Sequence, residues 1–251
     1  MKSGTVSTQT GAEQATDGQL LDIASALVQA TPRIISRQRA DHLLKDKSKW
    51  QEVVRQSLIG QTAGPDDVGR QLESWERHLF EWYRARVDCG KLNVPSLPAE
   101  KFVRPRLVVV PGAIKLNEIY VDYSTRFTSY RYADDLDGAH QSSQKRPSGD
   151  YVIWTEGAVE PSEALSGSPD ELDKRKFTYL VIKERMLLEP KHWEETGGGH
   201  LDLENVTITS SRDSDDFAFC AGWDDRQFSV YWWRRDHRHA SGRAREAVVN
   251  L

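Results

Sequence analysis

The sequence lacks the features that define disulfide-rich, zinc-binding and membrane-spanning proteins. Its 251 residues include only two cysteines, Cys89 and Cys220, which lie far apart and form no CxxC pair. This spacing excludes a zinc ribbon and a CxxC redox motif, so we expect both thiols to be reduced and partly buried, with one disulfide as the alternative. No apolar run approaches the roughly 20 residues that a membrane helix needs, so we expect no membrane partner.

We expect no secretory leader, and the chain carries no excess of basic charge. Its first ten residues contain no apolar segment of the kind that a signal peptide carries, so we expect a soluble, cytoplasmic protein. The formal net charge is −4, whereas proteins that bind duplex nucleic acid commonly carry a basic stripe. A nucleic-acid site would therefore need a local basic patch.

No motif of a known catalytic chemistry is present. The chain has no G-x-S-x-G segment, no phosphate-binding loop and no dinucleotide fingerprint. Gly197–Gly199 follow a predicted helix instead of preceding one, so they suit a helix C-terminus better than a phosphate site. Glu189-Pro190-Lys191 matches half of a metal-dependent nuclease motif, but the proline argues against the strand that this motif needs.

What the sequence does contain divides it into a helical part and a strand-rich part. Residues 1–16 hold little to bury and are predicted to form a disordered tail. Helical periodicity predicts a helical subdomain over residues 17–90, followed by a proline-containing linker over residues 91–106. Period-two alternation then predicts a strand-rich α+β domain over residues 107–251.

The clearest helical pattern runs from Val68 to Trp82. Its apolar residues recur at spacings of four and three, which places them on one side of a helix. A second helix is predicted within Thr178–Glu195, capped by Gly197, although a strand over Phe177–Ile182 is the alternative. Three further helices are expected over residues 17–31, 34–44 and 48–60, and a short one over Ser241–Val249.

The strand candidates fall into two groups. Leu107–Val110 is apolar and is predicted to be a central strand, while Glu118–Tyr123 and Phe127–Tyr132 alternate and could pair as a hairpin. Short connections favour an antiparallel three-strand meander at the C-terminal end. Its strands are Val206–Ser210, Phe217–Trp223 and Phe228–Trp233, and Asp150–Trp154 is a further candidate.

These elements predict an α+β fold. In it, the N-terminal helical subdomain packs on a mixed or antiparallel sheet that includes the C-terminal meander. The polar stretch Asp134–Gly149 is expected to be a mobile loop, and Glu156–Lys176 to be irregular or briefly helical.

Aromatic and basic residues gather in the C-terminal meander. Along the last strand, Tyr231 and Trp233 point to the face opposite Phe228 and Trp232. If that face is exposed, it can stack bases or contact a protein chain, and if a second layer covers it, it is core. Nearby aspartates offset the arginines, so a protein partner is favoured over single-stranded nucleic acid. The predicted binding residues are Arg212, Arg226, Tyr231, Trp233 and Arg235.

A second group combines histidines with carboxylates. His192, Glu195, His200 and Asp202 fall within one helix end and the following turn, and such side chains can hold a divalent metal. The group lacks an H-E-x-x-H motif, and the aspartates at 213, 215 and 216 lack the glycine and distal glutamate of a calcium loop. The alternative is a solvated helix end followed by a polar turn.

The sequence therefore favours a non-enzymatic binding or adaptor protein without a cofactor. It would engage a protein partner through the aromatic–basic C-terminal surface and the amphipathic helix Val68–Trp82. The alternative is a metal-dependent hydrolase that acts on phosphodiesters, in which a divalent ion activates water.

Overall fold

The structure, a computed structural model, describes residues 68–251 apart from residues 99, 142 and 225. All of these residues belong to one compact unit. The tail predicted for residues 1–16 and the helices predicted over residues 17–60 lie outside the described residues. The division of the chain at residues 90 and 106 stays a prediction.

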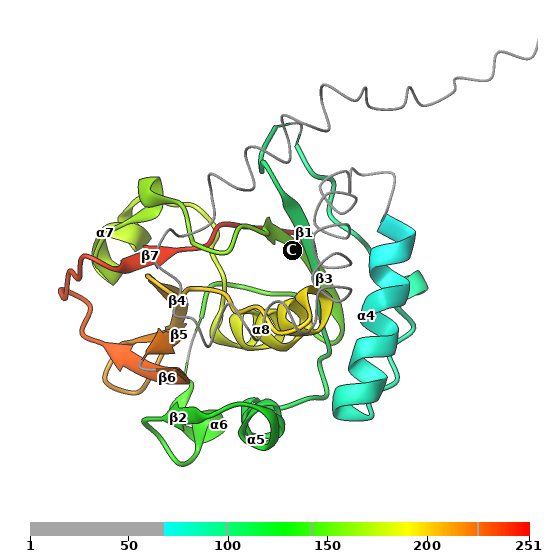
Figure 1. The fold of residues 1–251 in the computed structure, drawn as a ribbon. Helices are drawn as coiled ribbons and strands as arrows, with labels where there is room; N and C mark the ends of the chain where they lie inside the picture. The colour runs from blue at the N-terminus through cyan, green and yellow to red at the C-terminus, as the bar shows by residue number, and fades with distance from the viewer. Residues whose placement is uncertain (1–67, 99, 142, 225) are drawn as a thin grey trace, which may run out of the picture. The chain divides into compact units, whose positions relative to one another are not determined.

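Two β-sheets form the framework of this unit (Figure 1). The first has three antiparallel strands in the order β1-β3-β8. The second has the order β2-β6-β5-β4-β7, and its outer strands β2 and β7 run parallel to their neighbours. The predicted α+β class is confirmed. The strands are β1 (Pro105–Val110), β2 (Ser129–Arg131), β3 (Tyr151–Glu156), β4 (Val206–Arg212), β5 (Ala218–Asp224), β6 (Gln227–Trp233), β7 (Gly242–Ala244) and β8 (Ala247–Val249).

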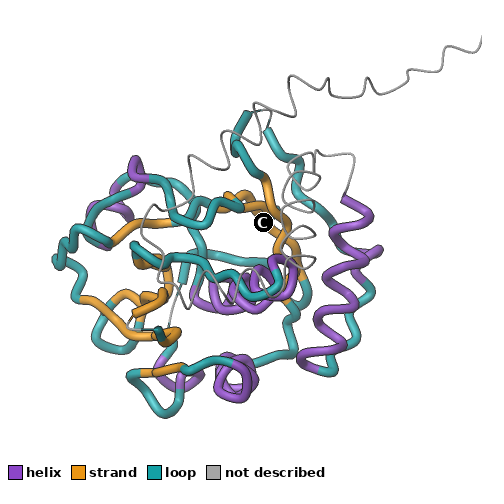
Figure 2. The backbone as a smooth tube through the Cα atoms, viewed as in Figure 1, coloured by secondary structure: helices purple, strands orange, loops and turns teal. Residues whose placement is uncertain are grey.

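Helices pack on both sheets, and α8 lies between them (Figure 2). Helix α8 contacts β1 of the first sheet and β4 and β5 of the second. Helix α4 lies against β1, while α7 lies against β4 on the other side of the unit (Figure 1). The helices are α4 (Val68–Tyr83), α5 (Leu116–Arg126), α6 (Leu136–Ala139), α7 (Pro169–Lys174) and α8 (Ile182–Thr196), with short 3-10 turns η3 (Cys89–Lys91) and η4 (Glu163–Leu165).

Helix α4 confirms the periodicity predicted for Val68–Trp82. One side of the helix is buried, and its outer side carries charged residues. Burial of this apolar side against β1 and α5 stabilises the helix far more than its intrinsic propensity does. The buried residues are Leu72, Trp75, His78, Leu79 and Trp82.

Helix α4 also closes the free edge of β1. The Trp75 indole N–H donates to the Leu107 carbonyl at 2.8 Å, and the Leu107 N–H donates to the Gln71 side-chain oxygen at 3.1 Å. The prediction that Leu107–Val110 is a central strand is wrong, because β3 holds the centre of its sheet. Its residues Leu107–Val110 are all apolar because α4 and α8 bury them, although β1 lies at the edge of its sheet.

Helix α5 replaces the strand predicted over Glu118–Tyr123, which is wrong. The apolar residues in this stretch satisfy helical spacing as well as alternation, and packing selects the helix. The Asp137 carboxylate accepts hydrogen bonds from the backbone N–H groups of Leu116 and Asn117, at 2.9 and 3.0 Å, and so caps the helix start. The buried residues of α5 are Leu116, Ile119 and Tyr123.

The hairpin predicted between this stretch and Phe127–Tyr132 is wrong as well. Only Ser129–Arg131 forms a strand, β2, and it pairs in parallel with β6. The Phe228 N–H donates to the Thr128 carbonyl at 2.9 Å, which begins this ladder. A long crossover therefore connects β2 to its partner, and no local turn signal could reveal it.

The helix predicted over Ser241–Val249 is also wrong, because this segment forms β7 and β8. Between them the chain crosses from the second sheet to the first. There, Leu180 N–H donates to the Arg245 carbonyl at 2.9 Å, and Ala247 N–H donates to the Thr178 carbonyl at 2.8 Å. The residues just before α8 are therefore extended, as in the strand alternative, whereas the helix itself begins at Ile182.

Other predictions are confirmed. Helix α8 continues through Pro190 to Thr196, and Gly197 caps it in the left-handed conformation with a φ of 68°.

The predicted meander is also present, since strands β4, β5 and β6 pair antiparallel in chain order. Cys89 and Cys220 are free and buried. Within residues 68–251, excluding 99, 142 and 225, no helix is long and apolar enough to cross a membrane.

The α4–β1 junction gives the first testable prediction. We expect Trp75→Phe to lower the free energy of unfolding by about 1–3 kcal/mol, because the buried Leu107 carbonyl loses its donor. Urea denaturation monitored by circular dichroism measures this. The control Phe80→Leu, on the exposed side of the same helix, should change it by no more than about 0.5 kcal/mol. Equal effects of the two substitutions would contradict the role assigned to Trp75.

Candidate functional site

The two faces of strand β6 contact different hydrophobic clusters. Phe228 and Val230 belong to the main core, which also contains residues of α4, α5 and α8. Tyr231 and Trp233 point the other way and pack against a smaller cluster. That cluster contains Leu172 of α7, Tyr179, and residues of β4, β5 and β7.

The smaller cluster is only partly covered. Helix α7 packs against β4, whereas Tyr231 and Trp233 on β6 remain partly exposed, with ring centroids 5.9 Å apart. Tyr130 on β2 is in register with Ser229 on β6, so its side chain points to this same side of the sheet. The adjoining Tyr132 ring lies 6.5 Å from that of Tyr130 and 4.5 Å from that of Trp232, a side chain of β6 that points to the opposite side of the sheet.

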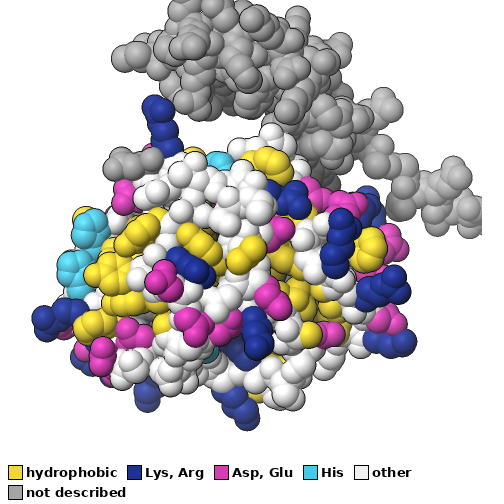
Figure 3. All heavy atoms as spheres, turned by 90° about the horizontal axis from the view of Figure 1, so that it is seen from below, with side chains coloured by type: hydrophobic (Ala, Val, Ile, Leu, Met, Phe, Trp, Pro, Cys, Tyr) yellow, Lys and Arg dark blue, Asp and Glu magenta, His cyan; other side chains and the backbone are white. Residues whose placement is uncertain are grey.

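Tyr130, Tyr231 and Trp233 on this side of the sheet, together with Tyr132 at its edge, are called the aromatic face below. Tyr130 is 45% exposed and Tyr132 is 61% exposed. Figure 3 looks at the molecule from the side on which β2 lies and shows hydrophobic side chains gathered there among acidic, basic and histidine side chains. Tyr130 and Tyr132 were not singled out from the sequence, because their placement depends on the parallel pairing of β2.

Two of the three arginines predicted to bind on this surface have partners within the protein. Arg212 is buried and donates to the Asp173 carboxylate at 2.7 Å and to the Tyr179 hydroxyl at 3.1 Å. Arg235 bridges Asp170 and Asp216. Arg226 is exposed in the turn between β5 and β6, where its φ is 70°.

The arginines of the loop after β6 are paired with carboxylates as well. Arg238 donates two hydrogen bonds to the Glu171 carboxylate, at 2.8 and 2.9 Å. Arg234 pairs with Asp236 at 3.3 Å. The arginine–carboxylate pairs of Arg235 and Arg238 fasten this loop to α7, so the arginines next to the aromatic face serve structure and leave little net charge.

The four metal-ligand candidates do not converge on one site. His192 contacts Arg106, with 2.9 Å between Nδ1 and Nη1, and Glu195 pairs with Arg106 as well. Burial and the Arg106 guanidinium lower the pKa of His192 to about 3. The His200 ring is held by Glu189 instead, at 3.0 Å. In the described part of the chain, no three His, Cys, Asp or Glu side chains lie close enough to share a metal ion.

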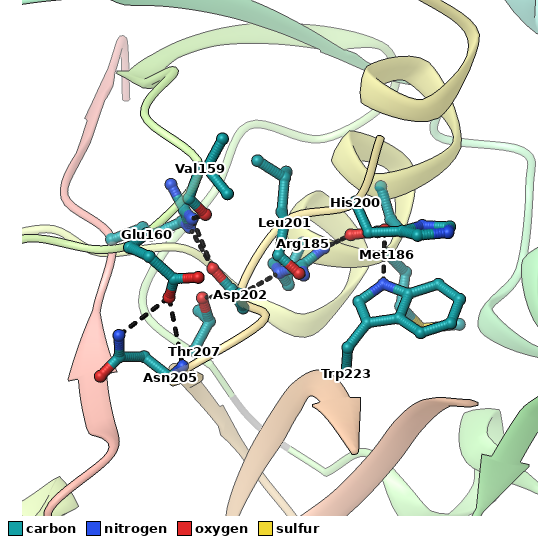
Figure 4. A network of polar contacts seen from close by, with 12 residues as sticks. Val159, Glu160, Arg185, Met186, His200, Leu201, Asp202, Asn205, Thr207 and Trp223 are labelled. Carbon is teal, nitrogen blue, oxygen red and sulfur yellow. Dashed lines mark hydrogen bonds and ion pairs between the residues drawn. The ribbon is translucent and has the colours of Figure 1, made fainter. Parts of the chain in front are cut away.

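Asp202, the fourth candidate, is the acceptor in a buried ionic network (Figure 4). Its carboxylate accepts from Arg185 at 2.7 Å, from the Thr207 hydroxyl at 2.5 Å and from Arg245. Burial alone would raise the pKa of Asp202, but Arg185 and Arg245 hold it below its ordinary value. The carboxylate is therefore ionised and saturated with donors, so it has no capacity left for a metal.

The network continues to the surface through Glu189. This buried carboxylate pairs with Arg185 at 2.9 Å and accepts the Trp223 indole N–H at 2.7 Å. It also orients His200, whose ring lies 3.7 Å from the Trp223 ring. Sequence reasoning identified His200 and Asp202 but missed Arg185 and Arg245, because buried arginines far apart in the chain carry no local signal.

Comparison with known proteins adds no identification. No protein-family model matches the chain, and no curated protein and no solved structure matches it.

The ionic network gives the second prediction. We expect Asp202→Asn to lower the free energy of unfolding by about 3–5 kcal/mol, because it leaves two buried guanidinium groups without their counter-charge. Chemical denaturation checks this. The control Asp236→Asn, in an exposed ion pair, should leave the free energy nearly unchanged. A mild effect at Asp202, comparable to that of the control, would show that the network does not organise the fold.

Proposed function

We propose that the protein is a non-enzymatic binding or adaptor protein that engages a protein partner through the aromatic face. The observation that carries this proposal is the partly open side of the five-stranded sheet. There Tyr130 is exposed on the strand next to the half-buried Tyr231 and Trp233, and Tyr132 is exposed at the edge of the sheet. Tyrosine and tryptophan suit such a surface, since they bury a large area and still offer a polar group at low entropic cost.

The charge around the aromatic face favours a protein over nucleic acid. Binding to phosphates gains affinity when arginines or lysines replace counterions. Arg212, Arg235 and Arg238 already donate to carboxylates of α7 or of the β4–β5 connection. Recruiting them to phosphate would break these pairs, whereas apolar contacts with a protein chain leave them intact.

The other surface expected from the sequence contributes less. The apolar side of α4, including Trp75 and Trp82, is buried within the unit and offers nothing to a partner while the helix is docked. Its outer side carries Phe80, which is 43% exposed below the guanidinium groups of Arg84 and Arg86. We therefore assign the partner site to the aromatic face alone.

The alternative is a metal-dependent hydrolase acting on phosphodiesters. It stays a prediction, because the described residues offer no set of side chains that could hold the metal ion. His192 and Glu195 share Arg106, while His200 and Asp202 each have buried partners of their own. No observation on the described residues favours this alternative, so we do not develop it.

The third prediction tests the aromatic face directly. We expect the double variant Tyr130→Ser/Tyr132→Ser to bind its protein partner at least about tenfold more weakly, because it removes two exposed aromatic contacts. Immobilised full-length protein, mass spectrometry of captured proteins and titration with the captured partner measure this. The control is Val103→Ser, which alters a side chain that is 91% exposed outside the face. Capture that is unaffected by the double substitution would contradict the proposal.

The fourth prediction separates the two kinds of partner. Titration with a short single-stranded oligonucleotide should produce no salt-sensitive quenching of tryptophan fluorescence, since the neighbouring arginines are paired. The titration is run at low and moderate salt, with Trp233→Ala as the comparison. Strong quenching that salt weakens and that Trp233→Ala abolishes would replace the protein partner by single-stranded nucleic acid.

A further inference from the structure

Helix α4 carries a fully buried histidine at its junction with α8. His78 is 0% exposed and lies among the rings of Trp75, Trp82 and Tyr83, at centroid distances of 5.4, 5.1 and 6.1 Å. Its Nδ1 contacts the Glu194 carboxylate of α8. Its Nε2 is buried and has no hydrogen-bond partner among the described residues.

This environment suits a neutral imidazole. The Nδ1–H group donates to Glu194, and the Nε2 lone pair then faces aromatic rings. A charged imidazolium carries an N–H at both positions and needs two acceptors. The docked helix provides one acceptor, whereas water provides both once the helix is released. Gaining a proton at His78 therefore costs more when α4 is docked than when it is free.

Several polar contacts besides that of His78 join α4 to the described residues of β1 and α8. Trp75 and Gln71 bond to the backbone of Leu107 on β1, and the buried Lys191 ammonium of α8 donates to the hydroxyl of Ser74 at 2.6 Å. The Arg126 guanidinium of α5 also lies 3.9 Å from the centre of the Trp82 ring, and apolar packing of Leu72 and Leu79 adds to the attachment. Of the groups named here, His78 is the one whose ordinary pKa lies between pH 5 and 8.

We infer that His78 is a pH-sensitive latch, and that mild acid weakens the docking of helix α4 on β1 and α8 while the two sheets stay folded. Release uncovers the apolar side of α4 and the free edge of β1, where Leu107 loses both of its side-chain partners. The proposal is independent of the aromatic face, which lies on a different sheet.

The charged groups around His78 shift its pKa in both directions. From α8, Glu194 and Glu195 favour the charged imidazole, and Lys191 opposes it. Arg77 of α4 lowers the pKa of Glu194. At the neighbouring Tyr83, Asp122 of α5 raises the pKa and Arg126 of α5 lowers it. Burial is the largest influence, so the pKa of His78 in the docked state lies below its ordinary value.

The direction of the pH effect follows from this difference. Released His78 titrates near the ordinary histidine pKa of about 6.5. Above that pH, His78 is neutral in both states and docking is at full strength. As the pH falls from there toward the lower docked-state pKa, the released state binds more protons and docking weakens by up to about tenfold per pH unit.

Hydrogen exchange of the full-length protein at pH 7.5 and pH 5.5, corrected for intrinsic exchange rates, tests the latch. We expect the α4 amides to lose protection by about tenfold on acidification, while β5 amides keep theirs. His78→Phe should make α4 protection independent of pH, because its ring fills the same space without a titrating group. The control His237→Phe, at an exposed histidine, should behave like the unmodified protein.

A second substitution covers the case in which His78→Phe does not fold. Glu194→Gln keeps an acceptor for Nδ1–H but removes the negative charge that favours imidazolium. Under the latch, His78 is neutral while α4 is docked, so loss of α4 protection in this variant should begin at the same pH as in the unmodified protein, near the pKa of released His78. If His78 instead bound its proton while docked, acid would strengthen docking in the unmodified protein, and Glu194→Gln would reduce that gain. Unchanged α4 protection between the two pH values, or simultaneous loss from α4 and β5 in every variant, would overturn the inference.

Discussion

The fold depends on the pairing of Asp202 with Arg185 and Arg245 at a point where both sheets meet. Arg185 comes from the central helix α8, and Arg245 comes from the crossing between β7 and β8. Arg245 also donates to the carbonyls of Ala158 and Val159, which follow β3, at 2.8 Å and 2.6 Å. One carboxylate therefore fixes the helix, the chain crossing and the end of a strand relative to each other.

Such a network specifies geometry more than it adds stability. The three charges must give up their hydration, and their mutual attraction offsets that cost only when every donor and acceptor is matched. The positive φ of 57° at Asp202 shows that the backbone accepts strain to aim the carboxylate. An apolar core at this point would tolerate several arrangements of α8 and the β7–β8 crossing, whereas the ion pairs tolerate one.

The elements that could be predicted are those whose own sequence carries enough periodic signal. Helix α4 has five apolar positions at helical spacing, and β4, β5 and β6 are seven-residue strands with short connections. The stretch that became α5 fits both periods, so packing and the Asp137 cap decide it. Strands β7 and β8 have three residues each and depend on partners far away in the chain. Among the site residues, Tyr231 and Trp233 could be placed on one face by alternation, but the inward turn of Arg212 could not, because Asp173 and Tyr179 belong to other elements.

The same pairing of charges explains why the aromatic face is the part of this surface that the proposed partner would contact. Arginines on β4 and after β6 point toward carboxylates of α7 and neighbouring turns, so the bonds that hold α7 and the loop in place also use up their charge. Tyr130 lies on the outer strand β2, and Tyr132 follows that strand and packs against Trp232, yet both tyrosines stay exposed. An internal role accounts for the charged residues predicted at this site, and it does not account for the exposed tyrosines. Exposed aromatic side chains carry a solvation cost that a folded chain can avoid, and contact with a partner removes that cost.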